Sequence, residues 1–246
     1  MNKLCSYNFI RFLKIVFISL SMTGVVIGQA SMKNRSNYDI YKYADKNFRY
    51  DSINIYKSID SLRYKKSDTK IYTELLRARY YSDNISKDKA LRILDSLIYK
   101  HQFINDTLKP YCRLFKSQIL LLKDTKKSLA EALDLENKLS KNKVSSTFLG
   151  DIYLSIGNGF SLSQNYSEGI NYYKKAEDYF KKCGNNPDLS VVYNNLGNSF
   201  RRIDNKDEGV LKYYNKAISV LGSKKHEHRK NIIKQNLYIV RLSLGK

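Results

Sequence analysis

Residues 153–176 read YLSIGNGFSLSQNYSEGINYYKKA, and this segment carries the pattern from which the fold can be predicted. It begins with an aromatic residue, then an aliphatic residue and a glycine, then Phe160 one helical turn further along the same face. The same order returns forty residues later at 193–200, and each copy continues into a second segment of helical pattern. The chain therefore contains an internal repeat of paired helices.

The two copies resemble the tetratricopeptide repeat, whose signature runs aromatic-x2-Leu-Gly-x2-Tyr and then Ala-x3-Phe. Residues 153–176 match this spacing without a gap, although the repeat here is about 40 residues long rather than about 34. The resemblance implies antiparallel helix pairs that bury their apolar faces by stacking. The expected fold is all-α, a right-handed superhelical solenoid of such pairs.

Columns of equivalent residues extend the repeat toward the N-terminus. Small residues, expected where two helices approach closely, recur at Ala78, Ser117, Gly157 and Gly197. Twelve residues after each come Ala90, Leu129, Gly169 and Gly209, followed four residues later by Leu94, Leu133, Tyr173 and Tyr213. In the last copy, Val210, Tyr214 and Ala217 fit the second helix better. These columns predict tetratricopeptide-like repeats over 67–222, after a degenerate first pair at 31–66.

Residues 223–246 read as a capping helix, with a packing stripe made of Ile232, Ile233, Leu237, Val240 and Leu244. Its basic start, Lys224–Lys230, fits either a docking patch for acidic groups or a soluble cap. The N-terminal residues 1–30 read as a secretory signal peptide cleaved after Ala30, because basic residues precede an apolar run that ends in Gly28-Gln29-Ala30. Export to the periplasm or the extracellular space follows, and an uncleaved segment that anchors the chain in a membrane is the alternative.

The composition favours helices and a basic surface. The chain has 11 Gly, 2 Pro and no Trp, which leaves little material for the turns of a many-stranded sheet. Its formal net charge is +21, of which residues 1–30 contribute three, so the remainder carries +18. This charge either steers acidic partners toward the protein or belongs to lysines that only solvate outward faces. Export argues against nucleic acid as the partner.

Residues suited to catalysis are scarce. The chain has three histidines, and His226 and His228 point in different directions on a helix, so they cannot chelate one metal ion. After signal cleavage two cysteines remain, Cys112 and Cys183, which stacked pairs would keep too far apart for a disulfide. Phosphate-binding, dinucleotide-binding and serine-hydrolase motifs are absent from the sequence. We therefore expect neither an enzyme nor a cofactor.

The resemblance places the binding surface on the first helix of each pair, which lines the inner groove in tetratricopeptide proteins. The inward positions it implies lie one residue past the small residue: Arg79, Gln118, Asn158 and Asn198. Asn194, Arg201 and Arg202 join them in the last full repeat. Amides can satisfy the backbone of an extended peptide, and arginine can clamp a carboxylate. The alternative is that these amides bond only to nearby backbone or water.

Two functions follow as expectations. The first is a non-catalytic scaffold outside the cytoplasm that binds a protein or peptide, with acidic ones as candidates, through Asn158, Asn194, Asn198, Arg201 and Arg202. A membrane would be a partner only if the N-terminal segment is uncleaved. The second is a ligand-sensing module, because the chain is similar to the exported part of bacterial regulators in which tetratricopeptide units precede a membrane helix and a cytoplasmic DNA-binding or kinase domain.

Overall fold

The computed structural model describes residues 66–100, 109–139, 144–204, 209–222 and 226–245. The predicted signal segment and the predicted first helix pair lie outside these residues, except for Lys66. The chain divides into two units, 1–69 and 70–246, and nearly all described residues belong to the second unit. All regular secondary structure in the described part is α-helical, which confirms the all-α class.

The described helices and their bounds are α4 (Lys66–Asn84), α5 (Lys87–Lys100), α6 (Lys109–Leu120), α7 (Thr125–Lys138), α8 (Ser146–Leu162), α9 (Tyr166–Lys182), α10 (Asn186–Ile203), α11 (Gly209–Ser219) and α12 (Glu227–Ser243). Helices α8, α9 and α10 are 17, 17 and 18 residues long, and only three residues separate each from the next. Long helices therefore absorb the length of the repeat.

Several helices start at a polar cap. The side chains of Asp124, Ser145, Asn165 and Asn185 each accept a hydrogen bond from the backbone N–H three residues later. Such caps satisfy amide groups that have no partner inside the helix. Pro187 lies in the first turn of α10, where its missing N–H is not needed. Short-range sequence thus sets where α7 to α10 begin.

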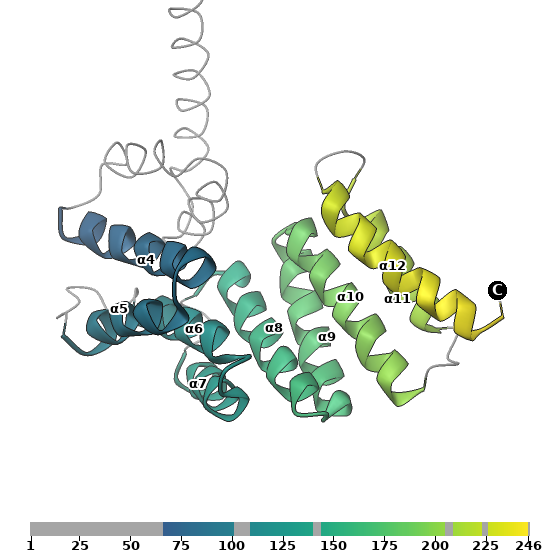
Figure 1. Cartoon of the computed structure of the whole chain (residues 1–246), viewed down its shortest axis with the longest axis horizontal. Helices are drawn as coiled ribbons and strands as arrows, with labels where there is room; N and C mark the ends of the chain where they lie inside the picture. Colours follow the sequence, from purple (N-terminus) through teal and green to yellow (C-terminus); the bar gives the residue numbers. More distant parts are fainter. Residues whose placement is uncertain (1–65, 101–108, 140–143, 205–208, 223–225, 246) are drawn as a thin grey trace, which may run out of the picture. The chain divides into compact units, whose positions relative to one another are not determined.

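Consecutive helices pack against each other from α5 to α12. Each helix from α5 to α11 contacts the next one along the chain (Figure 1). In addition, α6 contacts α8, and α8 contacts α10. Helices α6 and α8 therefore each lie against the next helix and against the helix two places further along the chain. This double contact lets the short helices bury apolar faces that none could cover alone.

Helices α5, α7, α9 and α11, which are the second helices of the predicted pairs, each bury three equivalent residues at spacings of four and three. Its members, all buried, are Ala90, Leu94 and Leu97; Ser128, Ala132 and Leu135; Gly169, Tyr173 and Ala176; and Val210, Tyr214 and Ala217. The preference for Val210 and Tyr214 in α11 is therefore confirmed.

The prediction for α7 is wrong by one residue, because Ser128 and Ala132 occupy the positions assigned to Leu129 and Leu133. Ser117 and Ser128 meet at the close contact, where the Ser117 hydroxyl donates to the Ser128 carbonyl at 3.0 Å. The Ser128 hydroxyl donates back to the Ser117 carbonyl at 2.8 Å. Leu129 instead faces α8, where a Cβ added at Gly159 would lie 3.0 Å from it. Ser128 follows Ser117 by 11 residues, whereas Gly169 follows Gly157 by 12, and this difference changes which face of α7 is buried.

The last helix, α12, lies inside the predicted cap at 223–246, but its packing stripe is narrower than predicted. Ile233, Leu237 and Val240 are buried, and Leu244 is half-buried. Ile232 is exposed. Neighbouring residues of a helix point about 100° apart, so Ile232 and Ile233 cannot both face the same partner.

Both described cysteines are free, as predicted. Cys112 is buried in α6, and Cys183 is exposed at the end of α9. Burial raises the pKa of the Cys112 thiol to about 12, so this thiol stays protonated at neutral pH. The buried Cys112 thiol therefore lacks the environment of an activated nucleophile.

Candidate functional site

The predicted column of Arg79, Gln118 and Asn158 joins each first helix to the next one. The contacts are Arg79 over the Phe115 ring, 3.9 Å from its centre; the Gln118 amide to the Ser155 hydroxyl at 3.5 Å; and Asn195 to the carbonyl oxygen of Asn158 at 2.9 Å. In each case the partner lies 36 or 37 residues further along the chain. The column therefore has a structural role at the stacking interface in addition to any role in binding.

Two of the predicted asparagines have the same partner in successive copies. The Tyr173 hydroxyl donates to Asn158 Oδ1 at 2.8 Å, and the Tyr214 hydroxyl donates to Asn198 Oδ1 at 2.8 Å. Burial raises the pKa of Tyr173 to about 12 and also raises the pKa of Tyr214, so both phenols stay protonated donors at neutral pH. Each phenol fixes which end of its amide is the oxygen and turns the Nδ2 group away from itself.

Asn158 and Asn194 also belong to a chain of four amides that crosses three helices. Asn236 of α12 donates to Asn194 at 3.0 Å, Asn194 donates to Asn195 at 3.3 Å, and Asn195 donates to Asn158 at 2.9 Å. Every bond runs from Nδ2 to Oδ1, so the dipoles of the side chains align. Neither Asn195 nor Asn236 was among the residues predicted from the sequence. The indication in the sequence was that Asn194 and Asn195 are adjacent, which places amides on two different faces of the same helix.

The two predicted arginines lie at the end of α10 and differ in burial. Arg202 is exposed, whereas Arg201 is half-buried. Arg201 Nε is shielded from solvent and has no hydrogen-bond partner among the described residues. The Arg201 charge acts to lower the pKa of Tyr214, against the larger effect of burial. Arg201 therefore lies close to the pair formed by Tyr214 and Asn198, with hydrogen-bonding capacity left to use.

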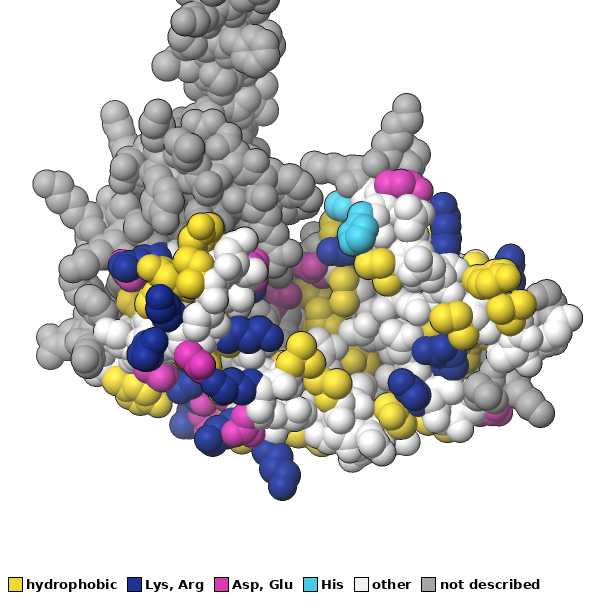
Figure 2. All heavy atoms as spheres, viewed as in Figure 1, with side chains coloured by type: hydrophobic (Ala, Val, Ile, Leu, Met, Phe, Trp, Pro, Cys, Tyr) yellow, Lys and Arg dark blue, Asp and Glu magenta, His cyan; other side chains and the backbone are white. Residues whose placement is uncertain are grey.

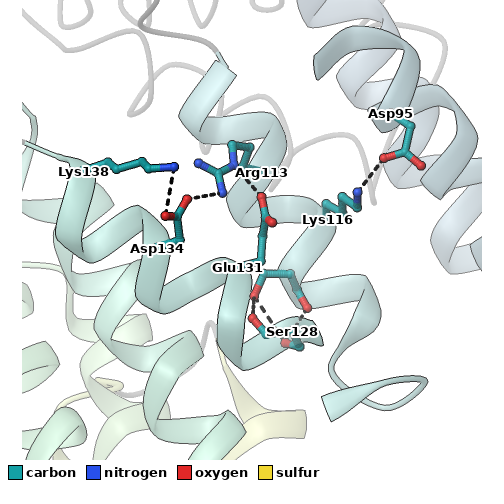
Figure 3. A network of polar contacts seen from close by, with 8 residues as sticks. Asp95, Arg113, Lys116, Ser128, Glu131, Asp134 and Lys138 are labelled. Atoms are coloured by element: carbon teal, nitrogen blue, oxygen red, sulfur yellow. Dashed lines mark hydrogen bonds and ion pairs between the residues drawn. The ribbon is translucent and has the colours of Figure 1, made fainter. Parts of the chain in front are cut away.

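A second polar cluster joins α5, α6 and α7 (Figure 3). Arg113 reaches Glu131 at 2.5 Å and Asp134 at 2.6 Å, and Lys116 reaches Asp95 at 2.7 Å. Hydrogen bonds from Arg113 and Lys138 lower the pKa of Asp134. This cluster was not predicted from the sequence, because its charges come from three helices. Its cations and carboxylates pair with each other, so the cluster links these three helices.

Part of the basic charge packs on the protein's own aromatic rings. Two copies repeat the arrangement: Phe160 stacks on Tyr172 under Lys175, and Phe200 stacks on Tyr213 under Lys216. Lys175 also pairs with Glu136 at 3.4 Å. These lysines stabilise contacts between helices through cation–π interactions. The charge of the chain is thus neither wholly free for partners nor merely solvated.

The described residues offer no other evident chemistry. No group of three or more His, Cys, Asp or Glu side chains in the described ranges could hold a metal ion. Among the helices of these ranges, none combines the length and apolar character needed to cross a bilayer.

The candidate site of the described residues is the polar strip, which we define as Asn158, Asn198, Arg201 and Arg202. A scan against models of known protein families found no match to the chain, and a search of curated proteins found no significant similarity.

Proposed function

We propose that the chain is a non-catalytic, tetratricopeptide-like scaffold that binds an extended acidic peptide or protein segment outside the cytoplasm. The repeated sequence columns and the packing of consecutive helices support a solenoid of helix pairs. In such arrays the function lies in the extended surface that the stacked helices present.

One observation carries the proposal: two equivalent amides in successive copies are oriented in the same way. The Tyr173 and Tyr214 hydroxyls occupy the oxygens of Asn158 and Asn198, which leaves Nδ2 donors for a ligand. Amide donors at a repeated spacing suit the carbonyl oxygens of an extended chain, or carboxylate oxygens. Arg201, close to Asn198, supplies a charge-assisted donor.

Among the predicted contact residues, Asn194 has the weakest case for binding a ligand. Its oxygen accepts from Asn236, and its nitrogen donates to Asn195. Using Asn194 for a ligand would compete with the amide chain that holds α12 to α10. We therefore assign ligand contact to the polar strip and a positioning role to Asn194.

The double variant Asn198→Ala with Arg201→Ala tests this assignment. Loss of a charge-assisted contact and an amide donor should weaken binding by roughly ten- to hundred-fold. The probe is an array of immobilised ten-residue peptides of acidic, neutral and basic composition, with bound protein measured by fluorescence. We expect the parent protein to bind acidic peptides preferentially.

Lys174→Ala provides the matched control for charge. Lys174 is exposed on α9 and makes no hydrogen bond or ion pair with the described residues. We expect this variant to bind like the parent. If the double variant folds normally and also binds like the parent, the polar strip is not the binding site.

Export is the part of the proposal that depends on residues 1–30. The basic start, the apolar run and the small residues before Ser31 support cleavage after Ala30. Intact-mass measurement of the secreted protein should give a chain that begins at Ser31. A chain that still begins at Met1 would favour the membrane-anchored form.

A further inference from the structure

Helix α12 has two apolar faces, and one of them is uncovered. Ile233, Leu237 and Val240 are buried, and α12 packs on α11. On the other side, large apolar residues remain exposed to solvent: Ile232 at 45%, Tyr238 at 63%, Ile239 at 49% and Leu242 at 59%. We call these four residues the outer face of α12. A cap that only solvates the end of a repeat array would be polar on this side.

The contacts between α12 and α10 show which positions of α12 are equivalent to those of α10, the first helix of the preceding predicted pair. Between successive first helices, Gln118 bonds Ser155 and Asn158 bonds Asn195, in both cases with a difference of 37 positions. Between α10 and α12, Arg229 bonds the Pro187 carbonyl and Asn236 bonds Asn194, in both cases with a difference of 42. The residues of α12 that contact α10 therefore lie five positions later in the sequence than the spacing between the other first helices would give.

When these five positions are added to the forty-residue repeat, each residue of α10 corresponds to the residue of α12 that follows it by 45 positions. Gly197 corresponds to Leu242, and Tyr193 corresponds to Tyr238. Gly197 is the residue whose added Cβ would meet the Tyr214 ring at 2.8 Å, so it faces the second helix of its own pair. On the outer face of α12, Tyr238 and Leu242 thus take the positions that α10 packs against α11.

The charges around this face indicate which partner fits. Helix α12 carries Arg229, Lys230, Lys234 and Arg241 against the single acid Glu227. Figure 2 shows hydrophobic and basic side chains together on the surface over this helix. A second copy of the chain would bring equal positive charge to the contact, whereas an acidic helix would complement it.

We propose that the outer face of α12 binds an amphipathic helix with acidic flanks from a partner protein. The helix takes the place that α9 takes on α8 and that α11 takes on α10. Its apolar stripe covers Tyr238 and Leu242, while its acids face Lys234 and Arg241. This is the helix-in-groove mode of recognition, and it uses residues distinct from the polar strip.

A designed peptide tests the proposal. The probe has the sequence of residues 166–182, with Lys174, Lys175, Lys181 and Lys182 replaced by glutamate and a fluorescein label at its N-terminus. It keeps the apolar stripe of α9 and reverses its charge. Fluorescence anisotropy with the purified chain should show saturable binding. The unaltered basic peptide should bind at least about ten-fold more weakly.

The variant Tyr238→Ser with Leu242→Ser should weaken binding of the acidic peptide by about ten-fold or more, because both side chains are central anchors. Both are exposed, so the fold is retained, and circular dichroism checks this. Leu122→Ser, which removes an exposed leucine 75% accessible in another part of the chain, should leave binding unchanged.

Two results would overturn the proposal. One is equal or absent binding of the acidic peptide to the parent and to the double serine variant. The other is a dimer of the parent chain in sedimentation velocity that the serine variant dissociates, because a second copy would then be the occupant. Binding of acidic peptides at the polar strip is measured separately, so either hypothesis can fail alone.

Discussion

Replacing Gly157 by leucine should lower the free energy of unfolding by about 1–3 kcal/mol or more. A Cβ at this position would lie 2.6 Å from the Tyr173 ring and 3.2 Å from the Gly169 carbonyl oxygen. The ring is buried and the carbonyl belongs to the backbone of α9, so neither can move away cheaply. The loss should exceed the gain of up to about 1 kcal/mol that leucine brings through its higher helix propensity.

Urea unfolding followed by circular dichroism measures this change. Asn171→Leu, which adds the same side chain on the exposed side of α9, is the control and should change stability by less than about 0.5 kcal/mol. Gly197→Leu should behave like Gly157→Leu, because its Cβ would lie 2.8 Å from the Tyr214 ring. Unfolding midpoints equal to the parent for both glycine variants would contradict the close approach of the paired helices.

Replacing Phe180 by alanine should cost about 3–5 kcal/mol of stability. The side chain is fully buried in the last turn of α9, and its ring lies 2.5–2.9 Å from where a Cβ of Gly150 would be. Truncation removes this ring from the contact between α8 and α9 and leaves a cavity. Urea unfolding measures the loss, with Ile203→Ala on the exposed side of α10 as the control.

A double-mutant cycle makes this prediction sharper. Gly150→Ala alone should destabilise the protein, because its methyl group would overlap the Phe180 ring. In the Phe180→Ala background the same methyl group enters the vacated space, so its cost should fall or change sign. Additive effects of the two substitutions would show that Phe180 does not pack on Gly150.

The candidate site could be predicted only in part. The family resemblance predicted Asn158, Asn194, Asn198 and Arg201 as inward positions, and the structure brings Asn158 and Asn198 into equivalent positions. The hydroxyls of Tyr173 and Tyr214 that orient these amides lie 15 and 16 residues away. Asn236 is 42 residues from its partner Asn194. Pairing at such distances leaves no local pattern, because it depends on how two helices cross.

What the sequence determined by itself was local or periodic. Helical periodicity and the glycines at 157 and 197 identified the paired helices, since any copy of the repeat meets the same neighbours. The tertiary structure decided which of two adjacent faces was buried, as at Ser128 rather than Leu129 and Ile233 rather than Ile232. A helix turns 100° per residue, so a one-residue change in a connection exchanges those faces. Which of the two faces is buried depends on the helices that pack against it, and these are distant in the sequence.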